Sequence, residues 1–319
     1  CEWHERLCYD IKINQELAKV YVDWAKDNPV DLGLGWGQEP WSQKEMPVTE
    51  ELVKEAAAQS DTAIVIIGRT AGEEKDITVD EGAYLLTKTE SDMMKLVRGN
   101  FDRMIVLLNV GGIMDMSFLD TISPDACMYV WQGGMIGGYG VADVLMGDVS
   151  PSGKLTDTIA YDIKDYPAYG NFGDGVRNFY KEDIYVGYRY FETFAKDKVL
   201  YPFGYGLSYT EFSLDNVKLS TQKVTPDGVE VTADVTNIGQ MDGTQTVLVY
   251  VKAEREGTPN PQLKGIAKAA LKKGETKTVH IALPEEAFGL CDDDGVKRVH
   301  QGSYTIYIGE KAAGTVVKD

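Results

Sequence analysis

The sequence predicts two domains: a three-layer α/β sandwich with a mostly parallel sheet, then an all-β sandwich of immunoglobulin or fibronectin type. Its 319 residues exceed what one hydrophobic core usually serves. Short continuous apolar runs alternate with helical patterns in the first part of the chain, as expected for a parallel sheet with crossover helices. Near residue 200 this pattern gives way to short strands separated by turns. We therefore expect domains at 1–205 and 206–319.

Two helices are expected at the start of the first domain. Residues 13–27 carry apolar side chains at helical spacing. An irregular stretch rich in glycine and aromatic residues follows, and it ends at Pro47. Thr49 then fits the N-cap of a second helix.

Three apolar runs rich in β-branched residues predict strands buried on both faces of a parallel sheet. These runs are 63–68, 104–110 and 126–131. A helix is expected between the first and second of these runs, with Thr89 and Asp92 forming a capping box. Another helix is expected over 138–147.

The second domain is predicted from strict alternation. Apolar residues at 229, 231, 233 and 235 alternate with polar ones, which is typical of a half-buried antiparallel strand. Further strands are expected at 212–219, 246–253, 276–283 and 303–309. Short strands at this spacing favour a β-sandwich.

Composition argues against several classes of function. A net charge of −18 repels phosphate backbones and anionic lipid, so we expect no nucleic-acid or membrane partner. No apolar run reaches the ~20 residues of a membrane span. The chain opens with Cys1 and shows no leader, so we expect a trimmed N-terminus and a cytoplasmic protein.

Cysteine and histidine are too scattered to predict a metal or cofactor. The four cysteines form no CxxC pair, and the three histidines are far apart in sequence. Cys127 lies inside an apolar run, where a buried thiol is expected. We expect no metal site and no cofactor.

Chemistry is expected where the parallel strands end, because ligands of open α/β sheets bind beyond the carboxyl ends of the strands. Three loops meet this condition: 69–76, 109–112 and 132–134. The first holds three carboxylates, an Arg and a Lys, so Glu73 or Glu74 could act as a general acid. A solvated polar loop is the alternative. The third resembles a phosphate cradle but lacks G-x-G spacing, which favours a close turn before a helix.

Several runs resemble glycoside hydrolase family 3. AIVIIGRTAGEEKD at 63–76 is similar to the acid/base loop of that family. The runs VLLNVGGIMDMSF, VWQGGMIGGYGVADVLMGDVSPSGKLTDT, DIYVGYRYF and LYPFGYGLSYTEF resemble its second domain and the junction to a fibronectin type III-like module. The resemblance covers roughly residues 50–319 and is greatest to β-glucosidase members of permuted domain order, in which these two domains precede the barrel.

The resemblance implies a retaining hydrolase of β-glucosides or related β-glycosides. An Asp of a (β/α)8 barrel would attack the anomeric carbon, and Glu73 would act as general acid and then base. Glu74 stands where the family commonly has Gly, so the choice between Glu73 and Glu74 stays open. The same resemblance implies substrate-binding or orienting roles for a further set of residues: Arg69, Glu74, Asp76, Trp131 and Gln132. Met135 and Ile136 replace a common Gln-Glu pair.

The barrel cannot fit in this chain, since it needs roughly 250 residues of its own. We therefore expect half of a two-carboxylate site, inactive alone, with a β-linked glycoside and the barrel of the same parent as partners. The alternative is a stand-alone carbohydrate-binding or scaffolding module, with stacking faces offered by Trp36, Trp41 and Trp131. Core or domain-contact positions are the plainer interpretation of these tryptophans.

Overall fold

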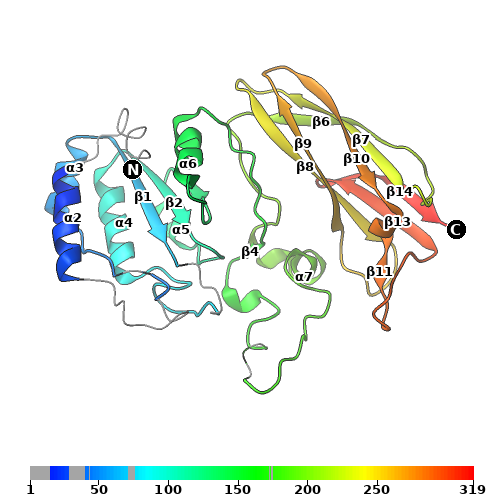
Figure 1. Cartoon of the computed structure of the whole chain (residues 1–319), viewed down its shortest axis with the longest axis horizontal. Helices are drawn as coiled ribbons and strands as arrows, with labels where there is room; N and C mark the ends of the chain where they lie inside the picture. Colours follow the sequence, from blue (N-terminus) through cyan, green and yellow to red (C-terminus); the bar gives the residue numbers. More distant parts are fainter. Residues whose placement is uncertain (1–14, 29–39, 43, 71–75, 172, 174) are drawn as a thin grey trace. The chain divides into compact units, whose positions relative to one another are not determined.

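The computed structural model describes residues 15–28, 40–42, 44–70, 76–171, 173 and 175–319, without the side chains of residues 15–18. The chain divides into two compact units, Cys1–Met146 and Gly147–Asp319 (Figure 1). We describe each unit by itself. The predicted domain boundary between residues 205 and 206 stays a prediction.

The N-terminal unit is an α/β sandwich around a parallel sheet of order β1-β2-β3. Its strands are β1 Thr62–Gly68, β2 Arg103–Asn109 and β3 Ala126–Tyr129. Its described helices are α2 Gln15–Asp27, α3 Glu50–Ala57, α4 Lys88–Asn100, α5 Phe118–Ile122 and α6 Gly137–Met146. Helices α4 and α6 lie on opposite sides of the sheet (Figure 1). The predicted α/β class and parallel strands are confirmed.

Burial differs between the strands of this sheet. On the central strand β2, Val106 and Leu108 are fully buried and Leu107 is 2% exposed, as expected for a strand covered on both faces. On the edge strand β1, Ile66 is 48% exposed, so the prediction of burial on both faces is wrong there. Cys127 on β3 is half-buried rather than buried, and desolvation raises the pKa of its thiol to about 12. The thiol therefore keeps its proton at neutral pH.

Helix caps decide where the helices of this unit begin. Thr49 caps α3 as predicted, because its hydroxyl accepts from the Leu52 N–H at 3.3 Å. The capping box predicted at Thr89 and Asp92 is wrong: Thr87 is the N-cap of α4, and Glu90 is its partner. The longer glutamate reaches back to the backbone N–H of Thr87 at 2.7 Å, which completes the usual T-x-x-E box.

The C-terminal unit contains a β-sandwich of two antiparallel sheets with the strand orders β10-β7-β6 and β14-β13-β8-β9. The sandwich strands are β6 Phe212–Leu219, β7 Val229–Asn237, β8 Gly243–Ala253, β9 Gln262–Leu271, β10 Thr276–Leu283, β13 Gly302–Ile308 and β14 Lys311–Lys318. The remaining elements are β4 Ile159–Ala160, β5 Val199–Tyr201, β11 Leu290–Cys291, β12 Lys297–Arg298, helix α7 Tyr188–Phe194 and 3-10 turns at Ile163–Asp165, Lys196–Lys198 and Glu285–Phe288.

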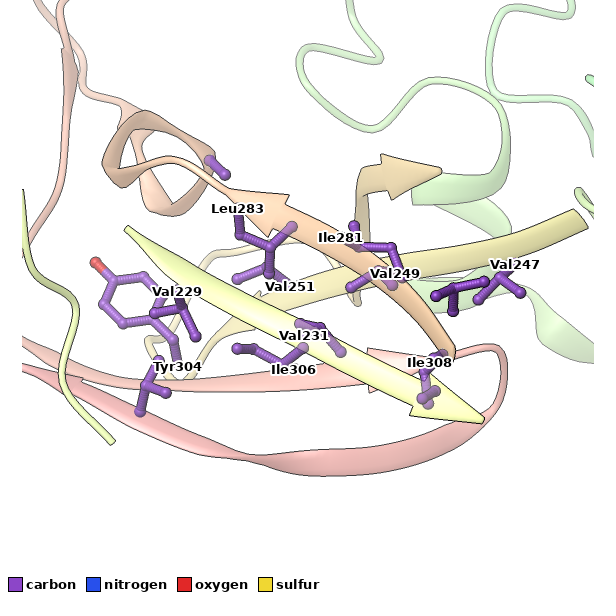
Figure 2. Close-up of a cluster of buried hydrophobic side chains, with 14 of the residues drawn as sticks. Val229, Val231, Val247, Val249, Val251, Ile281, Leu283, Tyr304, Ile306 and Ile308 are labelled. Carbon is purple, nitrogen blue, oxygen red and sulfur yellow. The ribbon is translucent and has the colours of Figure 1, made fainter. Parts of the chain in front are cut away.

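Alternating side chains from both sheets form the core of this sandwich. Figure 2 shows Val231 of β7 and Ile281 of β10 packed with Val249 of β8 and Ile306 of β13. All four are at most 4% exposed. The predicted all-β sandwich is confirmed, and the five predicted strands correspond to β6, β7, β8, β10 and β13. Strands β9 and β14 were not predicted.

No helix within the described ranges is long and apolar enough to cross a membrane.

Candidate active site

Three loops leave the carboxyl edge of the parallel sheet at the same level. The Arg69 N–H donates to the Asn109 carbonyl at 3.1 Å, which continues the ladder between β1 and β2. The Val130 N–H donates to the Leu108 carbonyl at 3.0 Å, which does the same for β2 and β3. The loops that follow therefore begin side by side, as expected for parallel strands.

The structure describes both ends of the first loop but not its middle. Glu73 and Glu74, the two candidates for the general acid, lie outside the described residues, as does Trp36. Asp76, where the description resumes, is exposed. The roles predicted for Glu73, Glu74 and Asp76 stay predictions.

Arg69 is the anchor of the first loop. Its side chain is 4% exposed, and its Nη1 and Nη2 reach Glu90 Oε1 at 2.6 Å and Oε2 at 3.0 Å. The other N–H groups donate to three backbone carbonyls: Gly68 at 2.7 Å, Ala83 at 2.9 Å and Leu85 at 3.2 Å. Since a guanidinium has five N–H groups, all of them are used. Arg69 thus holds the turn 83–85 and helix α4 against the end of β1, and its predicted contact with loop carboxylates or substrate stays a prediction.

Glu90 joins this anchor to the start of α4. The carboxylate is fully buried, and besides Arg69 it accepts from the Thr87 backbone N–H. A buried charge is tolerated when it is paired and fully hydrogen-bonded. The same carboxylate therefore fixes the start of a helix and the start of the loop expected to carry the acid.

The third loop contacts the first. The Gln132 side-chain amide donates from Nε2 to the Arg69 carbonyl at 3.3 Å, across the edge of the sheet. Trp131 is half-buried, with its ring 4.9 Å from that of Tyr129, and its φ of 53° turns the chain sharply at the end of β3. Gln132 thus contacts the start of the first loop, while the orienting or substrate-binding roles of Trp131 and Gln132 stay predictions.

The glycines of the third loop serve a close turn. A Cβ atom at Gly133 would lie 3.0 Å from the Cα of Gly137, the first residue of α6. This geometry confirms the predicted close turn before a helix. Met135 and Ile136, which follow, are 104% and 71% exposed, so this turn presents an apolar pair to solvent.

A second segment is tied to the first loop through Thr70. The Thr70 N–H donates to the Trp41 carbonyl at 2.7 Å, and its hydroxyl donates to the Pro40 carbonyl at 2.8 Å. The indole of Trp41 is half-buried. The chain before α3 therefore lies beside the start of the candidate acid/base loop.

Sequence reasoning missed Glu45, which lies in this segment. Its carboxyl is half-buried, and burial raises its pKa, with a further increase from the negative charge of Glu90 and a partial offset from Arg69. Nothing in the local sequence indicates this, because the perturbing pair is distant along the chain.

Comparison with known proteins decides the family. A family model described as "Glycosyl hydrolase family 3 C-terminal domain" matches residues 12–209, and one described as "Fibronectin type III-like domain" matches 245–312. The first covers more than half of the chain and includes all three loops. The chain belongs to glycosyl hydrolase family 3.

Relatives in glycosyl hydrolase family 3 extend well beyond this chain. A β-glucosidase of Ruminococcus albus is 50% identical over 93% of the chain but only 32% of its own length. The crystal structure of a β-glucosidase from Paenibacillus barengoltzii aligns with a TM-score of 0.85 and 44% identity, over 95% of this chain and 36% of that one. The structure of β-glucosidase 3B from Thermotoga neapolitana, solved in complex with glycerol, aligns with a TM-score of 0.83 and 30% identity. This alignment covers 98% of this chain and 45% of that one. The chain thus spans about a third of the curated relative from Ruminococcus albus.

Proposed function

We propose that this chain supplies the acid/base half of a retaining β-glucosidase, with Glu73 as the catalytic carboxyl. The observation that carries this is the buried ion pair of Arg69 and Glu90, which fixes the chain at the carboxyl end of β1, directly before the segment that contains Glu73. Membership of glycosyl hydrolase family 3 and the β-glucosidases among its relatives support the reaction class. Substrates are β-glucosides or related β-glycosides.

The reaction runs in two steps with one carboxyl changing role. Glu73 first gives its proton to the glycosidic oxygen while an Asp of the parent's barrel attacks the anomeric carbon and the aglycone leaves. The Glu73 carboxylate then takes a proton from water, whose oxygen displaces the barrel Asp and restores both groups. A loop that starts from a rigid anchor favours both steps, because the carboxyl must meet a sugar held mainly by another domain.

The remaining predicted residues act around Glu73. Arg69 is a positioning residue that acts through the backbone of the loop it anchors, and Gln132 supports it through the Arg69 carbonyl. Asp76, Trp131 and Glu74 complete the polar edge that faces the substrate. The α/β domain extends over 1–205 and the fibronectin type III-like domain over 206–319.

A leaving-group series in the full-length parent tests the assignment of the acid. Glu73→Ala should slow glucosides of poor leaving groups strongly, because these need protonation, and should spare the first step with activated aryl glucosides. Glu74→Ala, one residue away, is the matched control and should leave the dependence of the rate on the leaving group unchanged. If Glu74→Ala shows the steep dependence and Glu73→Ala does not, the assignment fails.

The chain alone should not turn over substrate, because an acid without the nucleophile cannot form the glycosyl intermediate. The purified chain assayed with an aryl β-glucoside tests this. Hydrolysis that Glu73→Ala abolishes in the chain by itself would contradict the division of the site between two domains.

A further inference from the structure

A groove of about 980 Å³ opens within the C-terminal unit. Its walls are helix α7, the segment 199–206 and the outer face of strands β8 and β13. On β8, Tyr250 alternates with the core residues Val249 and Val251 and therefore faces away from the sandwich core. Tyr307 on β13 does the same. The groove volume lies at the upper end of ordinary ligand sites and could hold more than one sugar ring.

Aromatic rings line this groove, and neighbouring rings hold them in place. Tyr188 stacks on Phe203 with centroids 4.5 Å apart and planes 25° from parallel. Tyr201 packs against Tyr205 at 5.0 Å, while Tyr205 itself is 38% exposed. The backbone of 204–205 is fixed by two 2.8 Å hydrogen bonds with Leu155. Rings that are already held rigidly lose little freedom when a ligand stacks on them.

Charges in the groove largely cancel. Lys196 pairs with Glu192 at 3.2 Å, and Lys252 pairs with Glu254 at 3.5 Å. The amine of Lys154 donates to the Gly206 carbonyl, and burial lowers its pKa. A ligand that carries a strong charge of either sign gains little from such a surface, whereas an uncharged polar ligand finds donors and acceptors.

The tyrosine hydroxyls supply further neutral hydrogen-bonding groups. Burial raises the pKa of Tyr250 to about 12, with smaller contributions from Tyr188 and Glu192, so its hydroxyl keeps its proton at any physiological pH. Such a hydroxyl can both donate and accept. The groove therefore combines flat apolar faces with neutral polar groups, the two surfaces that a sugar ring also presents.

We propose that this groove binds an uncharged oligosaccharide, with a sugar face stacked on Tyr205 and sugar hydroxyls bonded at the groove walls. The inference goes beyond the acid/base role of the N-terminal unit. It requires no hydrolysis, so binding to this chain can be measured whether or not Glu73 is the acid.

Titration of the chain with cellohexaose and with laminarihexaose, followed by calorimetry, tests the proposal. Saturable binding of at least one is expected. Tyr205→Ala should weaken that binding about tenfold, as the loss of a buried aromatic contact commonly does. Tyr205→Phe, which keeps the ring, should bind within about twofold of the parent chain. Tyr180→Ala is the matched control, since Tyr180 is 79% exposed and lies outside the groove.

Two results would overturn the proposal. One is the absence of saturable binding of either oligosaccharide, and the other is a loss of affinity in Tyr180→Ala as large as that in Tyr205→Ala. If Tyr205→Ala lowers the melting temperature, Glu310→Ala replaces it, because Glu310 is an exposed residue of the groove rim. Weaker binding by that variant supports the groove as the site, and unchanged binding rejects it.

Discussion

Arg69 and Glu90 lie 21 positions apart, yet together they determine where helix α4 and the candidate acid/base loop begin. Both side chains are almost completely excluded from water. Removing one partner of such a pair leaves the other as a buried, unpaired charge, which is strongly destabilising.

We predict that Glu90→Ala lowers the free energy of unfolding of the N-terminal unit by about 3–5 kcal/mol, through the unpaired Arg69 guanidinium. Urea denaturation followed by circular dichroism measures this. Asp92→Ala on the same helix is the control, because its ion pair with Lys88 is exposed and its loss should be hardly measurable. Similar losses in both variants would contradict the role given to Glu90.

Glu45 gives a pH dependence whose sign can be worked out. Its pKa is raised in the folded state by burial and by Glu90, so the folded protein binds its proton more tightly than the unfolded chain does. The free energy of unfolding therefore falls as pH rises from the pKa of the unfolded chain through the raised pKa of the folded protein. The contribution is fully present below the unfolded pKa. We predict that Glu45→Gln stabilises the protein modestly at neutral pH and that this gain disappears towards acidic pH.

Unfolding midpoints in urea across a pH series measure the effect. Glu55→Gln removes an exposed carboxyl on α3 and serves as the control. A gain for Glu45→Gln that stays constant with pH would show that the buried carboxyl does not titrate as described.

Strand β9 packs closely against the opposite sheet of the sandwich. A Cβ atom at Gly265 would lie 2.4 Å from Ile281 Cγ2 on β10, where the two sheets of the sandwich meet. We predict that Gly265→Ala destabilises the C-terminal unit by about 1–3 kcal/mol, because overpacking forces a well-packed core to shift. Thermal unfolding measures this. Gly175→Ala, at an exposed position with nothing within 4 Å, is the control and should be neutral.

The same strand explains what sequence patterns could predict at this scale. Strands β7 and β10 are rich in Val and Thr and alternate strictly, so their existence and faces could be predicted. Strand β9 reads QLKGIAKAAL and β14 reads KAAGTVVK, both rich in Ala, Gly and Lys with weak strand propensity. Pairing with β8 and β13 determines their structure, and no local pattern carries that information.

For the whole molecule, the sequence predicted where the candidate site lies better than how it is built. Parallel strands that end at Gly68, Asn109 and Tyr129 could be expected to bring three loops to one edge, because that follows from topology alone. The partner of Arg69 could not be predicted, since Glu90 lies on the next helix, where the sequence pattern indicates a capping box of Thr89 and Asp92 instead. Glu45 was missed for the same reason: its environment comes from residues distant in sequence.

The central claim is that Glu73 is the acid/base carboxyl of a retaining site. Azide rescue of Glu73→Ala in the full-length parent tests it most directly, with an activated aryl β-glucoside as substrate. Without its base, the variant should accumulate the glycosyl intermediate, and azide, which needs no deprotonation, should attack it. Faster turnover with β-glucosyl azide as the product is the predicted result. No rescue by azide, or rescue in Glu74→Ala instead, would contradict the account.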